Sequence, residues 1–312
     1  MPSPAPPDKT AQGMGGKPAR DGAVRYRIRH SSAYAYGNDI MLAHHLLHLT
    51  PRATPGQRVT NFRMAIDPPP SVRTEHRDYF GNPEVYLEMH EPHRKLTIQT
   101  EIDIEVATAR PTIAAMKTPW EEVRDQLLQP AGPGARAAST FAYASPMIAL
   151  GGALRAFAMP SFTRGRPIGE AAMDLTNRIH DEFTFDTEAT TIATPVGEVL
   201  ENKRGVCQDF AHLQIATLRS LGLAARYVSG YLRTIPPPGT KRVVGADVSH
   251  AWLSVWCGED RWLDLDPTNG RPGSSDLITL AWGRDYGDVS PSQGVTIGSH
   301  QQELEVKVDV EG

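Results

Sequence analysis

The sequence has few cysteines, no long apolar run and no excess of basic charge, and each absence excludes a class of protein. Its 312 residues contain two cysteines, Cys207 and Cys257, too few for a secreted disulfide framework. No apolar run reaches the roughly 18 residues of a membrane-spanning helix, and the Pro- and Gly-rich start lacks the apolar segment of a signal peptide. We therefore expect a cytoplasmic protein without a membrane partner.

The charge balance is equally informative about partners. The chain has 32 basic and 36 acidic residues, a net charge of −4, and no run of Lys or Arg. Nucleic-acid binding therefore has no electrostatic support. Hydrophobic residues make up 40% of the chain, enough for a substantial core, and the length suits two domains. The oligomeric state stays open.

The patterning changes along the chain and predicts an α+β protein. Residues 1–22 have the composition of a disordered tail, and residues 23–110 show short alternating strands separated by turns. In VRYRIRH, for example, Val24, Tyr26 and Ile28 alternate with arginines. An antiparallel, sandwich-like β domain is therefore expected at the N-terminus.

The remainder, residues 111–312, is predicted to be one catalytic domain. It divides into a helical part (111–200), a core that holds the main motifs (201–270) and a C-terminal extension (271–312). Helices are expected near 119–129, 145–158 and 168–185, and a final strand in the alternating stretch QQELEVKVDVEG.

The most informative stretch is GVCQDFAHLQIATLRSLG, where Cys207 begins an apolar helical pattern that Gly222 ends. The first turn of a helix carries partial positive charge, which favours a thiolate. Such a cysteine needs a base, and His250 in SHAWLSVW is the candidate. Asp266 in LDLDPTNG is the candidate carboxylate that would orient the imidazole. If the strands around them form a hairpin through Gly258, the two residues become neighbours.

Other residues near these motifs have weaker claims. Gln208 and the Cys207 backbone N–H are candidate oxyanion donors, and Tyr231 and Trp252 are candidate substrate-binding residues, although core packing also suits Trp252. Asp209 suits a helix cap, and His212 lies off the face of Cys207. A loop with Asp285, Tyr286 and Asp288 is expected at the mouth of the site. His44, His45 and His48 suggest zinc, but no cysteine or carboxylate cluster accompanies them, and no metal site is predicted.

Several blocks together resemble one family. GVCQDFAHL, YVSGYL, SHAWLSVW and LDPTNG are similar to the core of the transglutaminase-like superfamily of papain-type thiol enzymes. HLTPR (48–52), DYFGNP (78–83) and AWGRDYGDVSP (281–291) resemble its bacterial and archaeal branch with an N-terminal β domain. The resemblance implies a Cys207, His250 and Asp266 triad, with Asp266 rather than Asp264 as the carboxylate.

That triad implies acyl transfer through a thioester on a peptide or protein substrate, without metal or organic cofactor. Hydrolysis of a peptide, isopeptide or glutaminyl amide is the first expectation. Transfer to an amine, as in a transglutaminase, shares the first half-reaction and stays open. A peptide-binding module without catalysis is the alternative from another class, and the intact triad argues against it.

Overall fold

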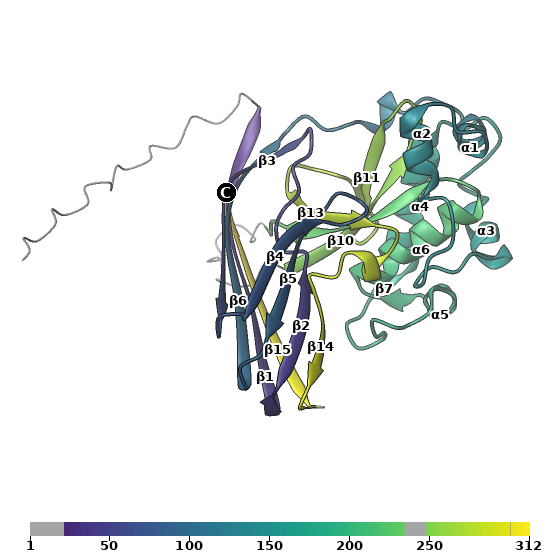
Figure 1. The fold of residues 1–312 in the computed structure, drawn as a ribbon. Helices are drawn as coiled ribbons and strands as arrows, with labels where there is room; N and C mark the ends of the chain where they lie inside the picture. Colours follow the sequence, from purple (N-terminus) through teal and green to yellow (C-terminus); the bar gives the residue numbers. More distant parts are fainter. Residues whose placement is uncertain (1–21, 235–247, 300) are drawn as a thin grey trace, which may run out of the picture.

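A computed structural model of the chain describes residues 22–234, 248–299 and 301–312. The expected disordered tail lies outside these ranges except for Gly22. Six α-helices among the described residues are gathered on one side of the molecule, and long antiparallel strands form the other (Figure 1). This arrangement confirms the expected α+β class. No helix in the described ranges is long and apolar enough to cross a membrane.

The strands, in chain order, are β1 (Ala23–Ile40), β2 (Leu42–Leu47), β3 (Gln57–Asp67), β4 (Val72–Arg77), β5 (Pro83–Met89), β6 (His93–Ala107), β7 (Thr184–Phe185), β8 (Arg204–Gly205), β9 (Ala225–Leu232), β10 (Val248–Trp256), β11 (Trp262–Asp266), β12 (Arg271–Pro272), β13 (Leu277–Gly283), β14 (Ser292–Ile297) and β15 (Gln302–Glu311). The helices are α1 (Trp120–Leu128), α2 (Gly132–Ser139), α3 (Gly152–Ala158), α4 (Ile168–Glu182), α5 (Val196–Asn202) and α6 (Cys207–Ser220), with short 3₁₀ turns η1 (Ile113–Ala115) and η2 (Tyr286–Asp288).

Two four-stranded sheets form the expected β-sandwich. Their strand orders are β15-β1-β6-β3 and β14-β2-β5-β4. The alternation in β1 explains the packing, since Tyr26 and Ile28 are buried while the arginines between them are exposed. A shared apolar core, including Tyr34, Leu47 and Leu87, fills the space between the sheets.

The C-terminal strands depart from the expected domain division. β14 pairs with β2, and β15 pairs with β1 over ten residue pairs. The strands β14 and β15 therefore complete the N-terminal sandwich and are not an extension of the domain that contains the main motifs. The alternating pattern correctly predicted a final strand, but a strand's partner depends on which edge the fold brings near, and sequence alternation carries no information about that.

The second unit contains a five-stranded antiparallel sheet of order β12-β11-β10-β9-β13. Its apolar face packs against α6 and the other helices through a core that includes Phe210, Leu213 and Leu253. The sequence predicted neither α2, in an Ala- and Gly-rich stretch, nor β13, at the sheet edge beside β9. The helix expected over 145–158 covers only Gly152–Ala158.

The sandwich and the helical unit share a third apolar core. Tyr26 and Ile28 of β1 and Val308 of β15 lie in one cluster with Tyr231 of β9 and Ile278 of β13. Burial of this apolar surface stabilises the contact between the two units. The N-terminal sheets are consequently placed beside the strands that carry the candidate site.

Candidate active site

Cys207 is the first residue of α6, as the sequence predicts, and its side chain is half-buried. Asp209 caps the helix, because its carboxylate accepts hydrogen bonds from the Val206 N–H (2.8 Å) and the Thr190 hydroxyl (2.6 Å). Gly205 makes room for this cap, since a Cβ there would lie 2.7 Å from the Asp209 carboxylate. The Gly and Asp around the cysteine therefore fix the start of the helix at Cys207.

His250 and Asp266 meet across the predicted hairpin. β10 and β11 pair from Trp256–Trp262 to Leu253–Leu265, around a turn at Gly258. The Nε2 of His250 lies 2.9 Å from the Oδ2 of Asp266, and both side chains are buried. Asp264 turns away and accepts from the Ser254 hydroxyl instead.

Hydrogen bonding sets the electrostatics of His250. Burial by itself would lower its pKa, but hydrogen bonds to Asp266 and to Cys207, with their charges, outweigh burial and raise the pKa to about 9. Burial likewise opposes ionisation of Asp266, yet the bonds from His250 and Asn269 hold its pKa below the usual value. His250 therefore bonds to Asp266 on one side and to Cys207 on the other, and it is protonated at neutral pH.

A cavity of about 430 Å³ opens on the thiol. It is lined from the helical unit by Val206, Cys207, Gln208, Tyr227, Ser229, Ser249, His250, Ala251 and Tyr286, and from the sandwich and its approach by His30, Ser32, Tyr34, Pro291, Ser292, Leu304, Val306 and Val308. Both units thus form the candidate site. Another cavity, of about 370 Å³ around Phe141 and Trp262, is lined by none of the three residues of the triad.

Tyr227 is a polar residue of this cavity that the sequence analysis did not identify. It is only 2% exposed, and burial raises its pKa well above the usual value, so it carries its proton. Among the described residues its hydroxyl has no hydrogen-bond partner. Gln208 also lines the cavity, but its Nε2 donates to the Ile192 carbonyl (3.4 Å).

Tyr231 and Trp252 do not line the cavity, contrary to their predicted role as substrate-binding residues. The Tyr231 side chain is buried, and its hydroxyl lies 3.0 Å from the Nδ1 of His30. Trp252 is buried and stacks with the His250 ring at 6.1 Å between centroids. Strand alternation puts Tyr227 and Tyr231 on the same face of β9, so periodicity alone could not tell which one reaches the thiol.

The loop between β13 and β14 contributes Tyr286 and Pro291 to the cavity lining. Asp285 is buried and accepts from the backbone N–H groups of Met147 and Gly287. Asp288 pairs with Arg284. His212, on α6, accepts from the Tyr286 N–H (3.1 Å), and burial lowers its pKa to about 4. It therefore holds the loop in place as a neutral acceptor and lies outside the cavity lining.

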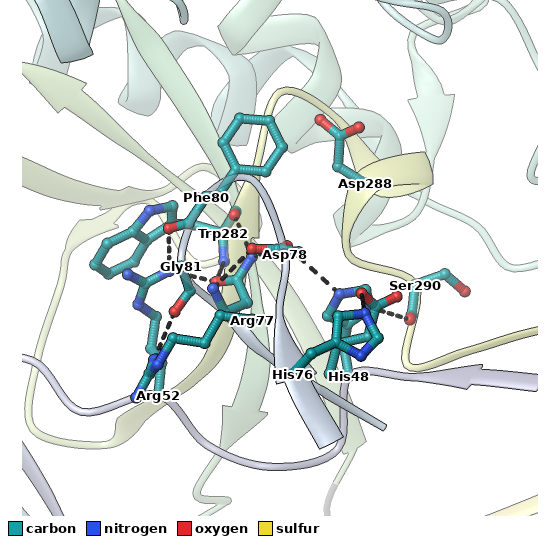
Figure 2. A network of polar contacts seen from close by, with 12 residues as sticks. His48, Arg52, His76, Arg77, Asp78, Phe80, Gly81, Trp282, Asp288 and Ser290 are labelled. Atoms are coloured by element: carbon teal, nitrogen blue, oxygen red, sulfur yellow. Dashed lines mark hydrogen bonds and ion pairs between the residues drawn. The ribbon is translucent and has the colours of Figure 1, made fainter. Parts of the chain in front are cut away.

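The segments HLTPR (48–52) and DYFGNP (78–83) of the β domain contact the end of β13 (Figure 2). The buried Asn82 side chain accepts from the Trp282 N–H (3.0 Å) and donates to the Trp282 carbonyl (2.9 Å). Arg52 donates to the Phe80 carbonyl and to Asn82, and its guanidinium lies 3.2 Å from the centroid of the Trp282 ring. These contacts fix the start of the loop that carries Tyr286.

The three histidines considered for zinc are separated by strand geometry. His44 faces Tyr86 on the sheet surface (2.6 Å), whereas its neighbour His45 points into the sandwich. His48 lies near the Ser290 carbonyl and the Asp78 carboxylate. Within the described part of the chain, no group of three or more His, Cys, Asp or Glu side chains is arranged to hold a metal.

Comparison with known proteins finds two family models on this chain. Residues 26–105 match the bacterial transglutaminase-like N-terminal region, and residues 157–267 match the transglutaminase-like superfamily. An uncharacterized protein of Mycobacterium tuberculosis is 42% identical over 297 residues, 93% of each chain. A protein-glutamine gamma-glutamyltransferase of Pseudomonas aeruginosa is 33% identical over 89 residues, which cover 28% of this chain and 11% of that protein.

Among solved structures, a "Putative Cysteine Protease" from Cytophaga hutchinsonii shares the fold. It superposes with a TM-score of 0.68 at 18% identity, and the match covers 92% of this chain and 91% of that one. The arrangement of the β region and the helical unit thus recurs in a known structure.

Proposed function

This chain belongs to the transglutaminase-like superfamily, with the bacterial transglutaminase-like N-terminal region ahead of its core, and we propose that it is a thiol hydrolase of amide bonds. The observation that supports this proposal most is that His250, which lines the same cavity as Cys207, is paired with the buried carboxylate of Asp266. The substrate would be a peptide, isopeptide or glutaminyl amide.

In the proposed reaction the Cys207 thiolate attacks the amide carbonyl carbon. As the C–N bond breaks, protonated His250 gives its proton to the leaving amine, and a thioester remains on the sulfur. His250 then takes a proton from water, which attacks the thioester and releases the acid and the thiolate. The raised pKa of His250 keeps the proton available for the first step.

The charge that develops on the carbonyl oxygen requires donors. The Cys207 backbone N–H at the start of α6 is one, because the first N–H groups of a helix have no partner within it. We assign the second to the Tyr227 hydroxyl, which lines the same cavity and carries its proton. Gln208 is the alternative donor from the sequence analysis.

Alkylation with iodoacetamide tests the thiolate, and the chain supplies an internal control. Cys257 is fully buried, and burial raises its pKa to about 12, so native labelling should stop at one equivalent, on Cys207. We expect fast labelling at pH 6 that His250→Ala abolishes and Cys257→Ala leaves unchanged. Labelling of Cys207 at the rate of a free thiol at every pH would exclude the enzyme.

Transfer to an amine is the second candidate function, in line with the relative named as a protein-glutamine gamma-glutamyltransferase. A glutaminyl peptide incubated with a fluorescent primary amine separates the two reactions. We expect ammonia release without amine incorporation. Amine incorporation that exceeds hydrolysis would show that the protein is a transamidase and not a hydrolase. If the thiol is activated but neither product forms, the substrate is a different amide.

A further inference from the structure

The wall of the cavity that faces Cys207 comes from the β-sandwich. In the β1–β15 register, Tyr34 pairs with Leu304, Ser32 with Val306 and His30 with Val308. Directly paired residues in adjacent strands project to the same face of a sheet. All six line the cavity, so this face of the sheet lies opposite the candidate nucleophile.

Two of these side chains are apolar and accessible. Leu304 is 50% exposed and Val306 is 45% exposed, although both belong to the face that is buried farther along the strand, at Val308. β15 is the edge strand of its sheet, which leaves this part of the face uncovered. Covering exposed aliphatic surface is favourable, so a ligand that contacts both side chains gains affinity.

The cavity lining is also uncharged at neutral pH apart from the candidate catalytic residues. It includes no Asp, Glu, Lys or Arg among the described residues. Burial lowers the pKa of His30 to about 4, so this imidazole is neutral. Two of the charged residues of β15 that alternate with the apolar ones, Glu305 and Lys307, pair with each other on the opposite face (2.7 Å). A charged ligand side chain would lose hydration here without gaining a partner.

We propose that Leu304 and Val306 form a specificity subsite that selects an uncharged aliphatic or aromatic side chain of the acyl-donor peptide. The proposal rests on the proposed thiol chemistry, because it makes the ligand a substrate of Cys207. It gives the N-terminal β-sandwich, through its last strand, a direct part in substrate choice.

Tripeptide chloromethyl ketones test this subsite, since the Cys207 thiolate displaces chloride and forms a C–S bond in a measurable inactivation. A series carries Leu, Asp or Lys at one position and Ala at the other two, and each position is scanned in turn. Each rate is divided by the iodoacetamide rate of the same protein. At one position we expect Leu to exceed Asp and Lys at least tenfold.

Substitutions on β15 test whether this strand causes the preference for Leu. Leu304→Ala with Val306→Ala should reduce the Leu preference about tenfold, and Val306→Lys should favour Asp over Lys at the same position. Val295→Ala is the matched control, because Val295 is 69% exposed on β14 and outside the cavity lining. Its preference should equal that of the wild type.

The outcomes separate the two proposals. Activated labelling by iodoacetamide with no Leu preference at any position, or with a preference that the β15 variants leave intact, would overturn the subsite and spare the thiol chemistry. Absence of activated labelling would overturn both.

Discussion

The imidazole of His250 and the carboxylate of Asp266 lie 2.9 Å apart, held by two strands joined through a tight turn. Asp266 also accepts from the backbone and side-chain N–H groups of Asn269, at 3.2 and 2.7 Å. The carboxylate is therefore fixed by its own turn as well as by the histidine. It fixes the ring through Nε2, which leaves Nδ1 for the thiol.

Asp266→Asn should reduce amide hydrolysis by a factor on the order of 10² to 10⁴, because the neutral amide neither stabilises the imidazolium nor fixes its tautomer. The same change should move the alkaline limit of activity. In the wild type, activity should fall as pH rises through about 9, where His250 loses its proton. In the variant this fall should occur at lower pH.

The measurement is kcat/KM for a peptide amide between pH 5 and 10. Asp264→Asn serves as the matched control, since Asp264 lies two residues before Asp266 on β11 and bonds to Ser254 instead of His250. Identical alkaline limbs in the wild type and Asp266→Asn would contradict the assigned role of Asp266.

Tyr227→Phe should lower the acyl-transfer rate about 10²-fold, the usual effect of removing one oxyanion donor. Alkylation by iodoacetamide develops no oxyanion, so its rate should stay within about twofold. Tyr231→Phe removes the corresponding hydroxyl outside the cavity and should keep the wild-type rate. If both reactions slow together in Tyr227→Phe, the tyrosine shapes the site and is not a donor.

Stability should decrease as the pH falls from about 6.5 to 4. Burial lowers the pKa of His30, His45 and His212 to about 4 in the folded chain, whereas the unfolded chain binds protons on these groups near pH 6.5. Protons therefore favour the unfolded state in this window, by about 1.4 kcal/mol per pH unit for each histidine.

His45→Leu isolates one of these contributions, because both ring nitrogens of His45 are buried without a partner among the described residues. Urea unfolding at pH 7 and pH 5 should show a loss of stability that is smaller by roughly 2 kcal/mol in the variant. If the loss of stability between pH 7 and pH 5 is the same in His45→Leu as in the wild type, the pKa of His45 is not lowered in the folded chain.

Asn82→Ala should destabilise the chain by on the order of 3 kcal/mol. The substitution removes both bonds to the backbone of Trp282 and leaves this part-buried N–H and carbonyl without the Asn82 partner. Urea titration measures the loss. Asp39→Ala is the control: it removes an exposed pair with Arg94, which solvent screens, and should leave the stability almost unchanged. If Asn82→Ala and Asp39→Ala had equal effects on stability, the hydrogen bonds between Asn82 and Trp282 would add no stability.

Local sequence was sufficient for the elements around the nucleophile. Gly205, Cys207 and Asp209 define the start of α6 by capping and dipole arguments alone, and the turn at Gly258 sets the register that brings His250 to Asp266. Alternation likewise predicted most strands of the sandwich. These features depend on residues close in sequence, where chain geometry leaves few alternatives.

The stretch around Cys207 thus determined by itself that a cysteine would begin a helix, and the segments around His250 and Asp266 determined that a hairpin would join these two residues. Only the tertiary structure decided what surrounds the thiol. The edge strand β15 returns from the C-terminus to pair with β1 and places Leu304 and Val306 opposite Cys207, and the packing of Tyr231 against His30 removes that tyrosine from the cavity. Contacts between residues far apart in the sequence, such as those of β1 and β15, depend on which sheet edges and faces pack together. The alternation of apolar residues indicates only which side of a strand is buried, and it cannot specify the strand that pairs with it.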